Sequence, residues 1–218
     1  DAFIEAANRL GNDNVRLITD AHYRYQSACQ RVTDAGLHII DETCDGWEDD
    51  DLNSHHKFCI VDSTIVWTGS YNITNSGTIY NNNNAVKIDC PDLAAAYLTE
   101  FNEMWGGTSG APGVCRFSTN KNTVVDHHLT CNGVNIDVYF SPTNDPSPDT
   151  MYDAMLSKLG GAMQSIHFCI FTYTQGGFAS KMIQQRDAGI TVRGVMDNTQ
   201  AGSYSVYEML MNNNMDVK

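Results

Sequence analysis

Basic residues are scarce in this chain of 218 residues. It contains 13 lysine and arginine residues against 26 aspartate and glutamate residues, which gives a formal net charge of −13 at pH 7. Proteins that bind nucleic acids without sequence preference neutralise phosphates with clustered Lys and Arg side chains. The charge balance therefore argues against a non-specific nucleic-acid binder and leaves small or neutral substrates open.

Long apolar runs are also missing. No stretch approaches the ~18 to 20 consecutive apolar residues that a membrane-spanning helix needs, and the opening DAFIEAANRL does not have the pattern of a secretory signal peptide. The sequence therefore predicts a mature or trimmed product without a transmembrane segment.

Cysteine, in contrast, occurs seven times, and many Asn and Thr residues accompany few Lys residues. This composition indicates a secreted, extracellular or periplasmic protein in an oxidising compartment. Cys59 and Cys169 lie in apolar strand patterns and are predicted to be buried thiols. Cys115 and Cys131 flank a polar connector and are the predicted disulfide partners. The odd number leaves at least one thiol unpaired.

The densest group of chemically useful side chains lies in His55–Asp62, which reads H-x-K-x4-D. Side chains alternate between the two faces of a strand, so a strand here would place His55 and Lys57 on one face and His56 on the other. An imidazole and an ammonium group that project into the same space suit a phosphate.

A second motif follows at Gly69–Asn72, which reads G-S-x-N. Ser70 and Asn72 share a face if residues 65–72 form the antiparallel return strand, and both are neutral donors. Chemistry on a phosphodiester needs a nucleophile and several donors for the phosphoryl oxygens, and the two motifs together provide both.

Together the two motifs resemble the active-site signature of the phospholipase D superfamily. The resemblance implies that His55 is the nucleophile or its acid/base counterpart and that Lys57 and Asn72 bind the phosphate. It implies that Ser70 is a supporting donor and that Asp62 is a mainly structural residue away from the phosphate. No metal ion or other cofactor is implied.

In this superfamily two such motifs face each other and share one active site. One histidine forms a phosphohistidine, and the other protonates the leaving alkoxide and then activates water or an acceptor alcohol. The chain has one motif, so the resemblance implies a second motif from a missing segment of the same protein or from a homo-oligomer partner. Asn83 is a departure, because many members have a glutamate there that orients the histidine, and an amide stabilises an imidazolium less.

An internal repeat predicts two lobes. Phe3–Ile40 resembles Phe178–Lys218, and aligning Asp20 with Asp197 gives a period of 177 residues (197 − 20). The period places an equivalent second motif beyond the last residue. The predicted domains are therefore the C-terminal part of a first phospholipase D-like lobe at 1–105, a linker rich in Gly, Ser and Asn at 106–136, and the N-terminal part of a second lobe at 137–218.

The order of elements predicts an α/β fold of layered lobes in which helices flank a mixed sheet. Apolar residues at four-residue steps within Pro91–Trp105 predict a helix that covers a sheet, with an amphipathic partner-binding helix as the alternative. The predicted strands are Val15–Thr19, His55–Val61, Ile65–Thr68, Ala85–Ile88, Ser165–Tyr173 and Thr191–Met196, and the predicted helices lie near Ala21–Ala35, Pro91–Trp105, Met151–Met163 and Phe178–Ala188.

The acidic run Glu48–Asp51 precedes the first motif. It is interpreted as a solvated loop, with a calcium site as the alternative, although no spaced pattern of oxygen ligands accompanies it.

Three functions stay open. The leading one is a secreted phosphodiesterase of phospholipase D type, with a phospholipid favoured over nucleic acid because of the acidic balance. The second is a nuclease of the same fold, which would need a basic groove elsewhere. The third is a non-catalytic extracellular protein in which half-lobes exchange between chains, and such a head-to-tail exchange forms a filament if it does not close.

Overall fold

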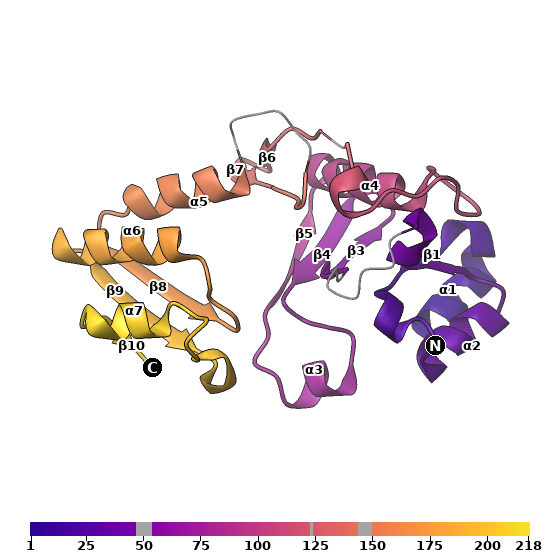
Figure 1. The fold of residues 1–218 in the computed structure, drawn as a ribbon. Coiled ribbons are helices and arrows are strands. Elements are labelled where there is room, and N and C mark those ends of the chain that lie inside the picture. Colours follow the sequence, from indigo (N-terminus) through magenta and orange to yellow (C-terminus); the bar gives the residue numbers. More distant parts are fainter. Residues whose placement is uncertain (47–53, 123, 144–149) are drawn as a thin grey trace. The chain divides into compact units, whose positions relative to one another are not determined.

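The computed structural model describes all residues except 47–53, 123 and 144–149. The chain divides into two compact units, Asp1–Pro146 and Ser147–Lys218, each with its own helices and strands (Figure 1). The mixed α/β architecture agrees with the predicted fold class. Within the described residues, no helix is both long enough and apolar enough to span a membrane.

The first unit begins with a small parallel sheet. Leu17 on β1 lies opposite Ile39 on β2, and helix α2 makes the crossover that parallel strands require. Ala7, Val32 and Leu37 are buried with Ile39 in one apolar cluster. The elements are α1 (Ala2–Leu10), the 3₁₀ turns η1 (Asn12–Asn14) and η2 (Ala21–Tyr23), β1 (Arg16–Ile18), α2 (Ser27–Asp34), β2 (His38–Ile40) and the 3₁₀ turn η3 (Glu42–Asp45).

A three-stranded antiparallel sheet follows, in the order β3-β4-β5. Helix α4 packs on it, because Leu93, Ala94 and Ala96 of the helix share a buried cluster with Val66 of β4. The elements are β3 (Phe58–Val61), β4 (Ile65–Gly69), α3 (Asn75–Ile79), β5 (Ala85–Asp89) and α4 (Pro91–Trp105).

Helix α4 has the predicted start and the predicted apolar stripe. Pro91 occupies the first turn, where the missing N–H leaves no hydrogen bond unmade. Leu93 and Trp105 are buried, and the ring of Tyr97 contacts Phe58 of β3 with 5.0 Å between centroids. The stripe therefore covers the sheet, as one of the two interpretations predicted.

Residues 106–136, predicted as a linker, pack against the rest of the first unit. Phe117 is buried beside Trp105 at the end of α4, and Arg16 donates a hydrogen bond to the carbonyl oxygen of Gly107 at 3.0 Å. Apolar residues scattered among the Gly, Ser and Asn residues explain the difference, because burying them requires contact with the unit. The elements are the 3₁₀ turn η4 (Ser118–Asn120) and the hairpin strands β6 (His128–Cys131) and β7 (Val134–Asp137).

Two disulfides join segments of the first unit. They are Cys44–Cys115, with 6.2 Å between Cα atoms, and Cys90–Cys131, with 5.5 Å. The predicted bridge between Cys115 and Cys131 is wrong. Cys115 lies in the buried cluster at the end of α4, whereas Cys131 lies with Cys90 in the cluster between α4 and the sheet. Because Cys115 and Cys131 lie in different clusters, they do not pair with each other.

Three cysteines are free thiols, namely the half-buried Cys29 and Cys59 and the exposed Cys169. Burial raises the pKa of the Cys59 thiol. The predicted burial of Cys169 is wrong, because the alternation along its strand places Ile166 inside and Cys169 outside.

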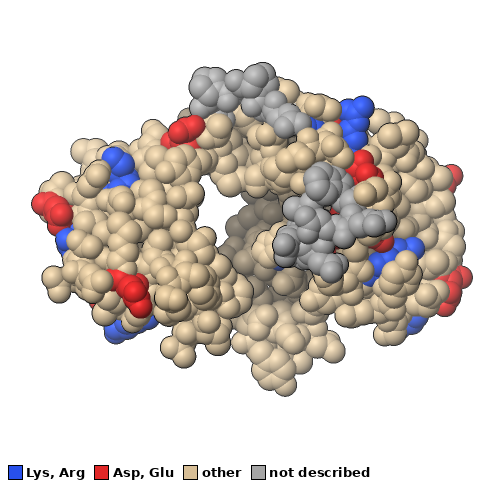
Figure 2. Space-filling model, in the orientation of Figure 1, with Lys and Arg blue, Asp and Glu red and all other residues tan. Residues whose placement is uncertain are grey.

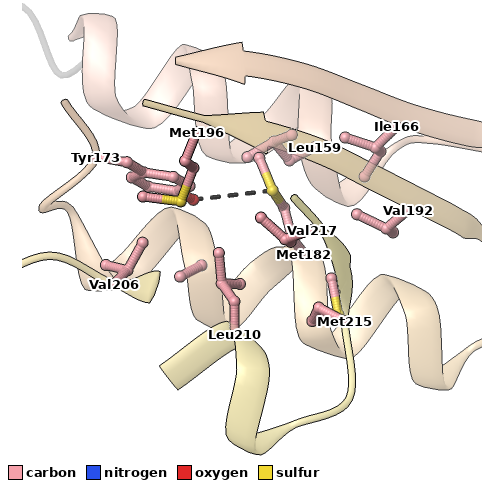
Figure 3. Packing of buried hydrophobic residues seen from close by; sticks show 11 residues of the cluster. Leu159, Ile166, Tyr173, Met182, Val192, Met196, Val206, Leu210, Met215 and Val217 are labelled. Carbon is pink, nitrogen blue, oxygen red and sulfur yellow. Dashed lines mark hydrogen bonds between the residues drawn. The ribbon is translucent and has the colours of Figure 1, made fainter. Parts of the chain in front are cut away.

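The second unit is built on a parallel sheet in the order β10-β9-β8. Figure 3 shows its apolar core, where the Tyr173 hydroxyl donates to the Met182 sulfur at 3.8 Å, and burial raises the pKa of Tyr173 to about 12. Strand β8 ends at Ile170, before the predicted end at Tyr173. The elements are α5 (Met151–Gly160), β8 (Ser165–Ile170), α6 (Gly176–Asp187), β9 (Thr191–Met196), the 3₁₀ turn η5 (Asn198–Gln200), α7 (Tyr207–Asn212) and β10 (Asp216–Val217).

The internal repeat has a structural counterpart. Asp20 follows β1 and Asp197 follows β9, and each carboxylate accepts a hydrogen bond from the backbone N–H two residues later, at 3.0 Å from His22 and 2.9 Å from Thr199. β1 pairs in parallel with β2, and β9 pairs in parallel with β10. Each aligned segment thus contains a strand, a capped 3₁₀ turn, a helix and a second parallel strand.

Candidate active site

Three segments of the chain meet at one end of the sheet β3-β4-β5. Because neighbouring strands are antiparallel, the residues that precede β3, follow β4 and precede β5 lie at the same end of the sheet. Figure 1 shows the excursion that carries α3 leaving the sheet at this end. All of the predicted site residues except Asp62 belong to these segments, namely His55, Lys57, Ser70, Asn72 and Asn83.

His55 and Lys57 lie directly before β3, which begins at Phe58 and not at the predicted His55. At this point the carbonyl oxygen of Lys57 accepts a hydrogen bond from the Thr68 hydroxyl at 3.2 Å. The half-buried Lys57 side chain turns back along its own segment, and its ammonium group donates to the carbonyl oxygen of His55 at 2.8 Å. The cation thus lies beside the backbone of the candidate nucleophile, whose side chain is exposed.

The surroundings of His55 favour its neutral form. Partial burial lowers the pKa of His55 below its ordinary 6.5, and the positive charges of Lys57 and His56 lower it further, while Asp20 acts in the opposite direction. Burial also lowers the pKa of Lys57, again opposed by Asp20. A neutral imidazole at neutral pH is the form that can attack phosphorus.

His56 contacts the apolar side of the same segment. Its ring meets those of Phe58 and Phe140 edge to face, with 5.4 and 6.2 Å between centroids. Its Nε2 lies 3.2 Å from Oε1 of Glu100 on helix α4. The alternation of His55 and His56 that the motif predicted is therefore visible in the partners of His56.

Glu100 is the centre of a buried ionic cluster that the sequence analysis missed. It is 1% exposed, and the ammonium group of Lys121, which is 3% exposed, donates to its Oε1. Burial alone would raise the pKa of Glu100, but His56 and Lys121 outweigh burial and the pKa is lowered. The signal in the sequence was an acidic residue at four-residue spacing between Ala96 and Met104, both of which are buried.

Ser70 joins the end of β4 to the start of β5. Its hydroxyl donates to Oδ1 of Asn83 at 3.1 Å and accepts from the backbone N–H of Asn84 at 3.1 Å. A hydroxyl has a single proton to donate, and here that proton goes to Asn83. Gly69 permits the close approach, because a Cβ at this position would lie 2.2 Å from the carbonyl oxygen of Asn84.

Asn83 holds the excursion that carries α3, since its side-chain amide donates to the carbonyl oxygen of Gly77 at 3.1 Å. Within the described residues, no hydrogen bond joins Asn83 to the ring of His55, although the resemblance assigns this position the role of orienting the histidine. The structure therefore places Asn83 with Ser70 and Gly77.

Asn72 presents an exposed side chain at the same end of the sheet. Its backbone is fixed, because its carbonyl oxygen accepts from the N–H of Thr74 at 2.8 Å and a Cβ on Gly77 would lie 2.3 Å from the same oxygen. Within the described part of the chain, the Asn72 amide makes no hydrogen bond, so it can bind a phosphoryl oxygen.

Asp62 lies at the opposite end of β3, in the turn to β4. Asp62 and Ser63 have φ values of 52° and 55°, and a type I′ turn requires positive φ at both central residues. The backbone N–H of Thr64 closes the turn on the carbonyl oxygen of Val61 at 3.1 Å. Asp tolerates this left-handed conformation better than most residues, which gives Asp62 a place in the hairpin and none at the phosphate.

Asp20 reaches the site from the parallel sheet. Its Oδ2 accepts the backbone N–H of Ser54, the residue directly before His55, at 3.1 Å. Its Oδ1 accepts from the backbone N–H of His22 and lies 3.0 Å from the ring Nδ1 of His22. The sequence analysis noted Asp20 in the repeat but did not place it at the site.

Metal ligands do not gather in the described part of the chain, where no group of three or more His, Cys, Asp or Glu side chains could hold an ion. The acidic run Glu48–Asp51, for which a calcium site was the alternative interpretation, lies outside the described residues.

Residues 1–105, which include both motifs, match a family model described as "Cardiolipin synthase, PLD-like domain". The chain is similar to the mitochondrial cardiolipin hydrolase of Xenopus tropicalis, with 36% identity over 93 residues, 42% of this chain and 41% of that protein. The corresponding proteins of Mus musculus and Chlamydomonas reinhardtii are 32% identical over 94 residues (42% and 39% of the two chains) and 35% identical over 51 residues (23% of each). The chain thus spans about two fifths or less of the length of these relatives.

Proposed function

We propose that the protein is a phosphodiesterase of phospholipase D type that acts through His55, and the match of residues 1–105 to a PLD-like family model supports the proposal. The observation that carries the proposal is the convergence of His55, Lys57 and Asn72 at one end of the sheet β3-β4-β5. This end offers a neutral imidazole as nucleophile, a cation, and an amide donor for the phosphoryl oxygens.

In the proposed reaction a neutral ring nitrogen of His55 attacks phosphorus. The N–P bond forms, the bond from phosphorus to the leaving oxygen breaks, and the leaving oxygen takes a proton from the histidine of a second motif. Water then attacks phosphorus and gives a proton to that second histidine, and the N–P bond breaks to release His55 and a phosphate monoester. Lys57 and Asn72 bind the non-bridging oxygens throughout.

The second motif must come from outside this chain, in which H-x-K-x4-D occurs once. We propose that another segment of the same protein or a second copy of the chain supplies it. The completed site would then contain a second set of residues, which orients the second histidine as the residues around His55 orient His55 in this chain.

The proposed substrate is a phospholipid and not a nucleic acid. The net charge of −13 opposes binding of a polyanion. On the face drawn in Figure 2, Lys and Arg side chains are dispersed and do not form the continuous basic patch that a nuclease groove needs. The similar proteins named above are cardiolipin hydrolases by name.

The proposed location is secreted or extracellular. Two disulfides within the first unit support it, because structural disulfides persist in oxidising compartments.

The experiment compares His55→Ala with His128→Ala, which changes an exposed histidine outside the motif. We expect His55→Ala to lower kcat on a chromogenic phosphodiester at least ~1,000-fold, because it removes the nucleophile, and His128→Ala to retain activity. Parallel assays with cardiolipin vesicles and single-stranded DNA distinguish the two substrate classes. Residual activity of His55→Ala above a hundredth of the parent, with the fold intact, would contradict the assignment, and faster turnover of DNA would favour the nuclease.

A further inference from the structure

One carboxylate connects the segment after β1 with the segment before β3 at the candidate site. Asp20 lies between β1 and the 3₁₀ turn η2, and its side chain is only 12% exposed. One of its oxygens caps η2 through the N–H of His22, and the other accepts the N–H of Ser54 at 3.1 Å, across 34 positions of sequence. The backbone immediately before His55 is therefore held by a side-chain carboxyl group from the segment after β1.

Among the described residues, no carboxylate other than that of Asp20 acts on the charge of His55. Asn83 stands where the resemblance would place a glutamate, and its amide is bonded to Ser70 and to Gly77. Glu100 is near, but it pairs with His56 on the apolar side of the segment. Within the described residues, Asp20 is the acidic group whose charge acts on both His55 and Lys57.

We infer that Asp20 is a positioning residue of the candidate site, which fixes the backbone before His55 and places a negative charge near the His55 ring and the Lys57 ammonium. The inference rests on the proposed function, because it assigns Asp20 a part of the role that a glutamate at position 83 would have. When the N–P bond forms, the ring of His55 becomes positively charged, and a nearby fixed anion stabilises that charge more than it stabilises the neutral ring.

The charges around His55 set the direction of the effect. Lys57 and His56 lower the pKa of His55 and Asp20 raises it, while Asp20 itself contacts His22 and interacts with Glu42. Removing the charge of Asp20 therefore leaves the two lowering neighbours unopposed. The pKa of His55 must fall further, and the acidic limb of kcat/KM must move to lower pH.

The internal repeat provides a matched control. Asp197 caps η5 in the same way as Asp20 caps η2, with the N–H of Thr199 at 2.9 Å. Its side chain is exposed, and in the described part of the chain it accepts no hydrogen bond from a distant segment. Asp197→Asn therefore removes the charge of an equivalent cap and leaves the bond between Asp20 and Ser54 unchanged.

The experiment follows the His55 ring proton by NMR titration of the full chain, together with the pH profile of kcat/KM. In Asp20→Asn, which keeps an oxygen to cap η2, we expect a lower pKa of His55 and a kcat about tenfold lower. Asp197→Asn should leave the titration of His55 as it is in the parent, and Asp20→Glu should lie between the parent and Asp20→Asn in both measurements. If Asp20→Asn does not fold, Asp20→Ser keeps a capping oxygen and also removes the charge.

An unchanged titration of His55 in folded Asp20→Asn or Asp20→Ser would overturn the inference. The titration needs no substrate, so it separates the two proposals. A lowered pKa of His55 in a protein without any phosphodiesterase activity would uphold the role of Asp20 and reject the proposed function.

Discussion

Lys57 affects both phosphate binding and the protonation of His55 in the proposed site. Under the proposed function its ammonium group binds a phosphoryl oxygen, and in the structure it donates to the carbonyl oxygen of His55 at 2.8 Å. A substrate phosphate can share this ammonium because the group has three protons to donate. After burial, the same charge is the next cause that lowers the pKa of His55, so Lys57 affects both phosphate binding and the nucleophile.

Replacing Lys57 by Met tests both effects. Met keeps the length of the side chain without the charge, and we expect kcat to fall about 100- to 1,000-fold, the range seen when a donor to developing negative charge is removed. Because Lys57 lowers the pKa of His55, that pKa should rise in the variant and the acidic limb of kcat/KM should move to higher pH. Steady-state kinetics across pH measures both, and a variant with unchanged kcat would exclude Lys57 from the site.

At the scale of elements, helix α4 contacts the segment that carries the first motif and stabilises it. It carries Glu100, which pairs with His56 in the segment before β3 and with Lys121 in the segment after the helix. The buried carboxylate thus ties both segments to the helix, and it does so with groups that would be costly to leave unpaired.

Glu100→Gln is expected to lower the free energy of unfolding by about 3 to 5 kcal/mol, because it leaves the buried Lys121 ammonium without this counter-ion. Since the pKa of Glu100 is lowered in the folded protein, its contribution is present above its unfolded pKa and is lost as pH falls through the folded pKa. Urea unfolding at neutral pH measures the loss.

Glu103→Gln is the matched control on the same helix. Its partner Arg116 has a half-exposed side chain, and an ion pair with an exposed partner contributes ~1 kcal/mol or less. The carboxylate of Glu103 also accepts the backbone N–H of Asn122 at 2.6 Å, a bond that the amide oxygen of Gln can still accept. A smaller loss is therefore expected for Glu103→Gln than for Glu100→Gln, and the double variant Glu100→Gln/Lys121→Met should recover part of the loss. Equal losses in the two single variants would show that burial of the Glu100 pair does not matter.

Local patterns predicted much of this part of the fold. The apolar stripe of α4 and the antiparallel return of β4 follow from spacing of 3.6 and 2 residues, which needs no knowledge of the partner. The start of β3 was predicted too early, because His55 and Lys57 precede the ladder, and the backbone groups of Ser54 and Lys57 bond to side chains instead. Such bonds depend on what Asp20 and Thr68 contribute from elsewhere in the fold.

The pairing of cysteines and the role of Asn83 show the same limit. Cys115 pairs with Cys44 across 71 positions of sequence, and no local pattern contains that distance. Asn83 bonds to Ser70 because β4 and β5 meet at that end of the sheet. The sequence predicted which residues belong to the candidate site, whereas the partner of each residue depended on tertiary packing.

At the scale of the whole molecule, one motif is half of the proposed catalytic set. If a second copy of the chain supplies the other half, specific activity must rise with chain concentration until the dimer is saturated. Sedimentation over the same concentrations should show the monomer giving way to the dimer, while a head-to-tail exchange that does not close would give larger, open-ended species. A well-folded monomer with constant specific activity at micromolar concentration would contradict completion by a second copy.

The two disulfides of the first unit overlap along the chain, since Cys90 lies inside the ring closed by Cys44 and Cys115, and Cys131 lies outside it. Any single backbone cut between residues 44 and 131 therefore leaves its two pieces covalently joined. A protease that cleaves once in the excursion around α3 should yield a band of full size on a non-reducing gel and two fragments only after treatment with dithiothreitol. Outside the cell, where proteases act and thiols stay oxidised, a molecule damaged once in this region would keep His55, Lys57 and Asn72 on a single connected scaffold.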